Sequence, residues 1–226
     1  MNNFIKNLNP EISENLFKNY QLFGKNYQNY FYELLRRNIA DISLNSNSKI
    51  IDDNKIILDY FNKKVLVDLK ERTVSYIKIT GNKYKDFLKE SEVDLFSSSI
   101  ILHFLLNADG TAITGKWISY MELPDGLFYS RTIPEVLKPL INKFENNGKL
   151  FLQKATQMGG IPDSSFKFSA VIYPFRMFPA LIIFEEKSEE FDADARILFD
   201  RSASHYLKTD IIKTMIVLIV KKFISD

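Results

Sequence analysis

Apolar residues recur at three- and four-residue steps over residues 11–39, and this spacing predicts one helix or a pair of helices. The shared face is strongly aromatic and consists of Leu16, Tyr20, Phe23, Tyr27, Tyr30, Phe31, Leu34 and Leu35. Gly24 is the expected point of interruption. The next stretch, residues 41–54, is rich in Ser, Asn and Asp, which is typical of a loop.

The pattern then changes to a period of two. Three short runs rich in Ile, Val and Tyr cover residues 56–61, 64–69 and 73–79. Short polar segments at residues 62–63 and 70–72 separate them, so we expect an antiparallel meander with tight turns.

The remaining chain alternates between the two patterns. Helices are expected over residues 91–106, 132–146 and 149–158, and from Thr209 to the end. Ser91 is the predicted N-cap of the first of these helices, and Thr209 that of the last. Strands are expected over residues 116–120, 166–173, 180–186 and 197–199. The segment from Pro174 to Pro179 lies between the two strands expected at 166–173 and 180–186, and it is not expected to be mid-sheet backbone throughout.

Strands in two clusters, with helices around them and at both ends of the chain, predict an α+β fold with an antiparallel or mixed sheet. We expect a single domain over residues 1–226, with a helical N-terminal segment at 1–45 and an α+β core at 50–222. The apolar stretch 211–224 is too short to span a bilayer, so it is expected to form a buried helix. The first ten residues lack a signal-peptide pattern, and a soluble cytoplasmic protein is expected.

Composition excludes several kinds of chemistry. The 226 residues contain no cysteine, so this chain cannot form a disulfide, a thiolate zinc site or an iron–sulfur cluster. With 30 basic and 28 acidic residues the net charge is +2, and the basic residues are scattered, so nucleic acid is not an expected partner.

Two local patterns resemble known sites but lack their defining parts. Residues 110–116 have the spacing of a phosphate-binding loop, but Trp117 stands where that loop needs Ser or Thr, and a predicted helix precedes it. Ser202, Ser204 and His205 lie close to Asp200, but no sharp nucleophile turn is present. We expect a glycine-containing turn in the first case and helix-capping serines in the second.

The two histidines are the most informative polar residues. His103 lies in an apolar helix, where burial favours the neutral imidazole and a structural role. His205 lies in a loop that leads into the last helix, a better place for a ligand to bind. A neutral imidazole can ligate haem iron or corrinoid cobalt.

Two segments carry a family resemblance. The first runs from His103-Phe104-Leu105-Leu106-Asn107 through Gly110 and residues 114–119 to Glu122-Leu123-Pro124-Asp125-Gly126. The second is residues 198–207, followed by Thr209-Asp210. Together they resemble domain of unknown function family 3786, over roughly residues 50 to 222. The resemblance implies an anaerobic bacterial or archaeal context and, through some relatives, a link to corrinoid proteins.

The matching positions include polar or amphipathic residues in apolar surroundings, namely His103, Trp117, Glu122, Asp200, His205 and Tyr206. Trp117 and Tyr206 are expected to line a cleft for a flat ligand such as a tetrapyrrole or corrinoid. His205 is the expected ligand to that cofactor, with His103 second. Glu122 and Asp200 would orient an imidazole as hydrogen-bond acceptors.

Two other functions stay open at this point. The aromatic N-terminal helix would suit a protein partner or a second copy of the chain, and Tyr27 and Phe31 would then be essential. Alternatively, Glu122, Asp200 and His205 would act as general acid and base in an enzyme, although the sequence favours a binding protein over a catalyst.

Overall fold

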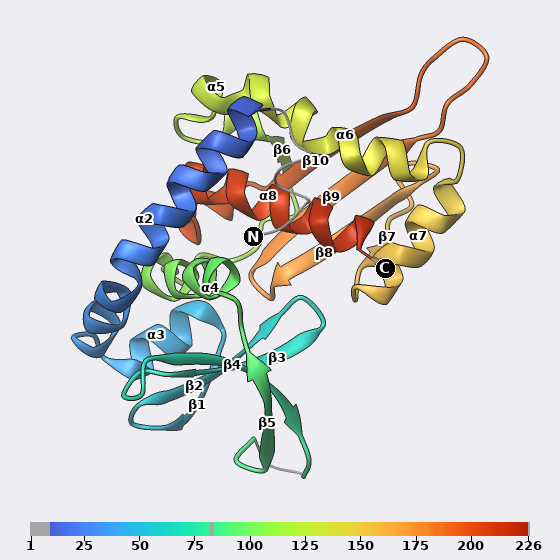
Figure 1. Ribbon diagram of the computed structural model, residues 1–226. Helices are drawn as coiled ribbons and strands as arrows, with labels where there is room; N and C mark the ends of the chain where they lie inside the picture. Colours follow the sequence, from blue (N-terminus) through green and yellow to red (C-terminus); the bar gives the residue numbers. More distant parts are fainter. Residues whose placement is uncertain (1–9, 82–83, 226) are drawn as a thin grey trace.

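The computed structural model describes the backbone of residues 10–81 and 84–225 (Figure 1). The side chains described are those of residues 21–81, 84–128 and 130–225, so Leu16 and Tyr20 of the predicted aromatic face lie outside them. The α-helices are α2 (Pro10–Leu35), α3 (Ile39–Ser46), α4 (Leu95–Asn107), α5 (Gly126–Tyr129), α6 (Ile133–Phe144), α7 (Gly148–Gln157) and α8 (Thr209–Ile224). With two antiparallel sheets, they confirm the predicted α+β class.

The first sheet is a meander in sequence order. Its strands are β1 (Lys49–Asp52), β2 (Lys55–Tyr60), β3 (Lys63–Asp68), β4 (Thr73–Ile79) and β5 (Phe87–Glu92). The three predicted strands are its centre. The prediction of a loop at 41–54 was wrong, because α3 and edge strand β1 form there. Asn38 caps α3 by accepting a hydrogen bond from the backbone N–H of Ala40, and Asn47 ends it in the left-handed conformation.

The second sheet has the strand order β6-β10-β9-β8-β7. Its strands are β6 (Trp117–Ser119), β7 (Ile161–Pro162), β8 (Ser169–Phe175), β9 (Phe178–Glu185) and β10 (Asp194–Asp200). As expected, the segment from Pro174 to Pro179 is not sheet backbone throughout, because a turn at residues 176–177 interrupts it; β8 and β9 nevertheless extend past their predicted ends and include Pro174 and Pro179. The pairing of these two strands is irregular between Ile172 and Phe175, and such an irregularity accommodates the proline residue that cannot donate a ladder hydrogen bond.

Helices cover the second sheet and join it to the first (Figure 1). Helices α6, α7 and α8 pack together on the second sheet, and the ring of Phe151 in α7 stacks on Phe223 in α8 at 5.1 Å between centroids. Helix α4 packs against α2, α3 and α8. A direct link between the sheets is the hydrogen bond from the N–H of Phe61 to the carbonyl of Pro174, 2.8 Å long.

Two predicted helix starts were wrong. Asp94, not Ser91, caps α4, and its carboxylate accepts hydrogen bonds from the N–H groups of Phe96 and Ser97. Ser91 instead pairs with Tyr76 in edge strand β5. Thr209 is the first residue of α8 rather than its cap. The buried α8 matches the expectation of a core helix, and no helix in the described part of the chain is long and apolar enough to cross a membrane.

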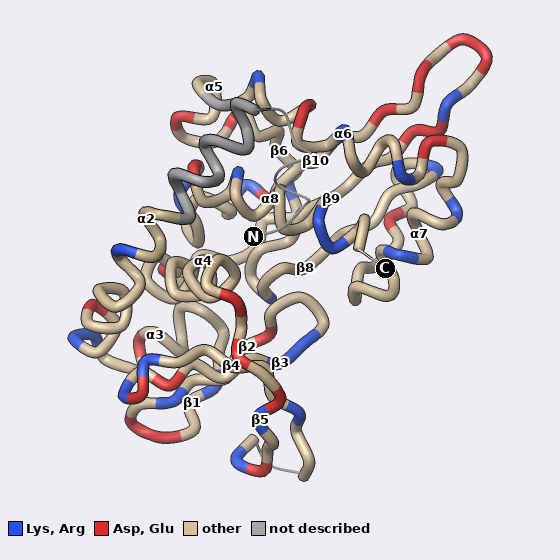
Figure 2. The backbone as a smooth tube through the Cα atoms, viewed as in Figure 1, with Lys and Arg blue, Asp and Glu red and all other residues tan. Residues whose placement is uncertain are grey.

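Charged side chains of both signs are spread over the molecule (Figure 2). The most prominent acidic feature is the protruding connection between β9 and β10, which carries Glu189, Glu190 and Asp192. Lys187 forms an ion pair with Asp192 across this loop, 3.0 Å long. The loop lacks the geometry of a metal site and is a solvated hairpin.

Candidate functional site

The two segments that carry the family resemblance meet at the carboxylate of Asp200. This side chain, at the end of β10, is fully buried. It accepts hydrogen bonds from the N–H and hydroxyl of Thr114, from the N–H of Gly115 (2.7 Å), and from the N–H and hydroxyl of Ser202 (2.9 and 2.7 Å). The loop between α4 and β6 is thereby fixed to the turn that precedes α8.

These bonds keep Asp200 ionised. Burial alone would raise the pKa of Asp200, but the hydrogen bonds from Ser202 and Thr114 outweigh burial and lower it below its usual value. A carboxylate whose lone pairs are all engaged by donors is a structural acceptor. Asp200 is therefore neither a base nor a ligand in this arrangement. Ser202, which donates to Asp200, is likewise not paired with His205 as a hydrolase would require.

His205 is held by the opposite loop. Its Nδ1 atom lies 2.7 Å from Oδ2 of Asp109 and 3.1 Å from the hydroxyl of Thr111. The other oxygen of Asp109 accepts the N–H of Thr111 at 2.9 Å, so the carboxylate is fixed at both ends. Despite its partial desolvation, the bonds from Thr111 and His205 lower the pKa of Asp109 to about 2.

This contact determines which ring nitrogen is available. An ionised carboxylate can only accept, so Nδ1 of His205 carries a proton toward Asp109. In the neutral imidazole, Nε2 is then unprotonated and free to accept a hydrogen bond or to bind a metal. The side chain of His205 is 47% exposed, so solvent and ligands can reach it.

His205 lies at the wall of a pocket of about 380 Å³. The pocket is lined by Thr111, Thr114, Ile118, Glu122, Pro124, Arg201, Ser202, Ser204 and His205. The hydrogen bonds from the N–H and hydroxyl of Ser119 lower the pKa of Glu122, and the charge of Arg201 adds to this effect. The structure thus places His205 and Glu122 on one pocket, but Glu122 does not orient the imidazole as expected, because its carboxylate accepts from Ser119 while Asp109 holds Nδ1 of His205.

Comparison with known proteins gives a family without a known activity. A family model described as "Domain of unknown function (DUF3786)" matches residues 38–222. The chain belongs to this family. No curated protein and no solved structure matches it. The matched residues include every member of the His205 pocket, so the pocket is part of the DUF3786 domain proper.

The aromatic walls expected for a flat cofactor do not form in this DUF3786 domain. Tyr206 is fully buried, with its ring stacked 5.6 Å from that of Phe104 and its hydroxyl donating to the carbonyl of Thr111. Trp117 is half-buried in β6, where it pairs with Asp200 in the sheet register, and it does not line the His205 pocket. Tyr206 supports the pocket loop from beneath instead of facing a ligand.

His103 faces another part of the molecule. Its ring centroid lies 4.6 Å from that of Tyr30 and 5.8 Å from that of Phe23, both in α2. Burial lowers the pKa of His103 to about 4, so the ring is neutral at physiological pH. This environment agrees with the structural role expected of a core histidine. No described contact joins His103 to His205.

Sequence reasoning missed three members of the site, Asp109, Thr111 and Arg201. The signal that could have identified Asp109 is its position beside Gly110 in the first matching segment. Gly110 has φ of +83°, which turns the chain so that Thr111 meets both Asp109 and His205. Among the described residues, no group of three or more His, Asp or Glu is arranged to hold a metal ion.

Proposed function

We propose that this protein binds a small molecule that carries a carboxylate and also donates a hydrogen bond. The observation that carries the proposal is the 2.7 Å contact between Asp109 and Nδ1 of His205 at the wall of the pocket. It orients the imidazole and leaves Nε2 as an acceptor directed away from Asp109. A hydroxyl or amine of the ligand would donate to Nε2.

Arg201 supports the choice of a carboxylate. Its guanidinium is permanently charged and offers a planar set of donors that matches a carboxylate. Glu122, on the same pocket, has one oxygen committed to the N–H and hydroxyl of Ser119 at 2.7 and 2.8 Å. A second anion would therefore bind on the side of Arg201 away from Glu122, because like charges repel.

The haem or corrinoid hypothesis has weaker support from the geometry. Nε2 of His205 would be its axial ligand. The pocket of about 380 Å³ is at the lower end of the range for ligand sites, and most of the residues that line it are polar or charged. Tyr206 and Trp117, which were to hold the faces of the macrocycle, do not line it. The residues present fit a compact polar ligand and do not form a macrocycle cleft.

The structure also bears on the two other functions, the protein-interaction helix and the acid–base enzyme. On α2, Phe31 is fully buried and Tyr27 packs edge-on against it at 5.3 Å, so the aromatic face serves the chain's own core over residues 21–35. Acid–base catalysis keeps His205 as a candidate base, oriented by Asp109, whereas Asp200 is excluded by its five hydrogen bonds. Both a binding protein and an enzyme that uses His205 would first have to bind a small molecule at this pocket.

Calorimetric titration with malate and succinate tests the proposal. The two probes differ by one hydroxyl, so malate is expected to bind more tightly, and His205→Ala is expected to remove the difference. Arg201→Ala should weaken both probes by about tenfold or more, the loss typical of a hydrogen bond to a charged group. Arg176→Ala is the matched control, since Arg176 is exposed in the turn between β8 and β9.

Equal binding of malate and succinate, or equal effects of Arg201→Ala and Arg176→Ala, would refute the proposal. A separate titration with haemin and with aquocobalamin, followed by visible absorption, tests the macrocycle hypothesis. A saturable one-to-one spectral shift that is lost in His205→Ala would favour the macrocycle over the small acid.

A further inference from the structure

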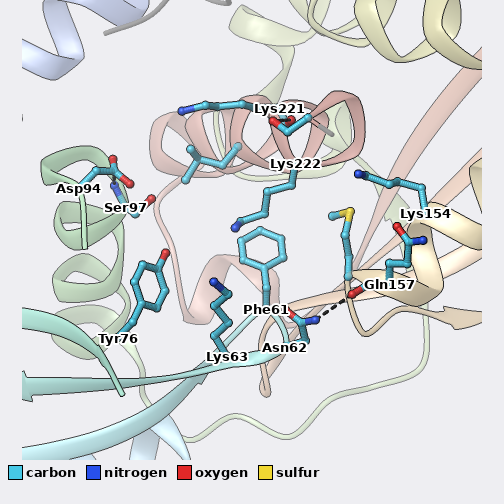
Figure 3. A pocket seen from close by; sticks show the side chains of 13 residues that line it. Phe61, Asn62, Lys63, Tyr76, Asp94, Ser97, Lys154, Gln157, Lys221 and Lys222 are labelled. Carbon is cyan, nitrogen blue, oxygen red and sulfur yellow. Dashed lines mark hydrogen bonds between the residues drawn. The ribbon is translucent and has the colours of Figure 1, made fainter. Parts of the chain in front are cut away.

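A second pocket, unrelated to the family segments, lies where the two sheets approach each other. Its volume is about 400 Å³. Its walls come from the turn between β2 and β3, from β4, from the N-terminal end of α4 and from the C-terminal ends of α7 and α8 (Figure 3). It shares no lining residue with the His205 pocket, so the two sites are tested independently.

Four lysines line this pocket against a single acid. They are Lys63, Lys154, Lys221 and Lys222, and the acid is Asp94. Some described lysines outside the pocket do form ion pairs, as Lys64 does with Asp59 at 2.6 Å. Within the described residues none of the four pocket lysines forms an ion pair. In a chain with nearly equal numbers of basic and acidic residues, this is a local excess of positive charge.

Two of the ammonium groups are held in place by aromatic rings. Nζ of Lys222 lies 4.6 Å from the ring centroid of Phe61 and 5.7 Å from that of Tyr60, and Nζ of Lys63 lies 5.0 Å from that of Tyr76. Figure 3 shows Lys222 descending from α8 and Lys63 rising from β3, so that their ammonium groups face one another beside the Phe61 ring. Burial, and then the charge of Lys63, lowers the pKa of Lys222. Asp94 is the one carboxylate in the lining, and its charge offsets only part of the positive charge gathered there.

The wall beneath them is fixed. The amide of Asn62 donates to the carbonyl of Gln157 at 2.8 Å, which joins the β2–β3 turn to the end of α7. Gly159 permits this contact, because a Cβ atom there would lie 2.8 Å from Cβ of Asn62. The pocket also offers apolar surface from Phe61, Met158 and Leu218, beside the hydroxyl of Tyr76. A rigid cationic pocket with an apolar side suits a phosphate ester whose other end is apolar or aromatic.

We propose that this pocket binds a phosphorylated small molecule, with its phosphate held by Lys63, Lys154 and Lys222 and its uncharged part against Met158 and Leu218. The phosphate would supply the counter-charge that Asp94 alone does not. Lys221, at the rim, would add attraction at longer range.

Calorimetric titration with pyrophosphate, AMP and adenosine, at about 0.15 M salt to suppress weak surface attraction, tests this site. We expect saturable one-to-one binding of AMP or pyrophosphate and none of adenosine. If AMP binds more tightly than pyrophosphate, the uncharged part of the ligand contributes to binding. If the two affinities are equal, the pocket recognises phosphate alone. Lys63→Ala and Lys154→Ala should each weaken binding by about tenfold or more.

Lys64→Ala is the matched control, because it removes the same charge one residue away from a lysine already paired with Asp59. It should leave the affinity unchanged. Circular dichroism confirms that each variant is folded. Absence of saturable binding by both phosphate probes in the folded wild-type protein, or equal losses in Lys63→Ala and Lys64→Ala, would overturn the proposal.

Discussion

Replacement of Asp200 by Asn tests how the two segments of the site are held together. In the wild type, Oδ1 accepts from Ser202 and Oδ2 accepts the N–H of Gly115 at 2.7 Å, while Thr114 donates to both oxygens. An Asn side chain that keeps the Ser202 bonds places its own NH₂ group against the N–H of Gly115. One charge-assisted bond becomes a donor–donor contact, and the others become neutral bonds.

A hydrogen bond to a charged group contributes about 1.5–3 kcal/mol, and an unpaired buried donor costs a similar amount. The smaller desolvation of the neutral amide offsets part of this loss. We therefore expect Asp200→Asn to lower the free energy of unfolding by about 2–4 kcal/mol, which is a large share of the stability of a typical domain. Urea denaturation, with an unchanged m-value, measures it.

The pH dependence provides a second readout. Because the folded-state pKa of Asp200 is lowered, its ionised form stabilises the fold above the unfolded pKa of about 3.9 and loses this effect as pH falls through the folded value. The difference between wild type and Asp200→Asn should be constant above about pH 5 and shrink below about pH 4. Asp163→Asn is the control for the size of the loss, since Asp163 accepts the N–H of Ser165 in a local turn and does not join distant segments as Asp200 does. If Asp200→Asn lowered the free energy of unfolding by less than about 0.5 kcal/mol, the reasoning would be refuted, because the hydrogen bonds to Asp200 would then not fix the loop.

Two further predictions concern the core and the backbone. His103, with a pKa of about 4, binds a proton more weakly in the folded than in the unfolded state, so stability should fall as pH drops from about 6.5 toward 4. His103→Phe should remove this component in urea titrations, and an imidazole that titrates near 6.5 by NMR would contradict it. Gly159→Ala should cost more stability than Gly115→Ala. Both glycines have positive φ, but a Cβ at 159 meets Asn62 at 2.8 Å, whereas a Cβ at 115 meets nothing within 4 Å. If thermal unfolding showed equal stability losses of about 1 kcal/mol for Gly159→Ala and Gly115→Ala, the positive φ alone would account for both losses, and the contact with Asn62 would contribute nothing.

The sequence predicted elements whose pattern is local. The central strands β2, β3 and β4 alternate with a period of two, and α8 is apolar throughout, so both were predicted correctly. The errors lie where tertiary contacts override local preference. Ser91 looks like an N-cap, but the edge of β4 offers it a strand partner, and Pro174 is tolerated because the β8–β9 pairing is irregular.

The site was predicted in part for a related reason. His205 and Glu122 were identified because they are polar residues beside apolar ones, and the structure places both on one pocket. Tyr206 and Asp200 share that pattern but are buried, because their polar atoms find partners in a loop about 90 residues earlier in the chain. Such long-range pairing leaves no local signal. The four lysines of the second pocket come from three segments far apart in the sequence and were not recognised as a group.

The orientation of His205 is the central claim, and NMR of the imidazole nitrogens tests it most directly. In long-range ¹H–¹⁵N spectra of the neutral ring, we predict a protonated Nδ1 and an unprotonated Nε2, with the Nε2 resonance shifting when malate is added. Asp109→Asn should weaken this tautomer preference, because the amide can also donate to Nδ1. A protonated Nε2 in the neutral ring of the wild type, or an Nε2 resonance that does not respond to malate, would contradict the account.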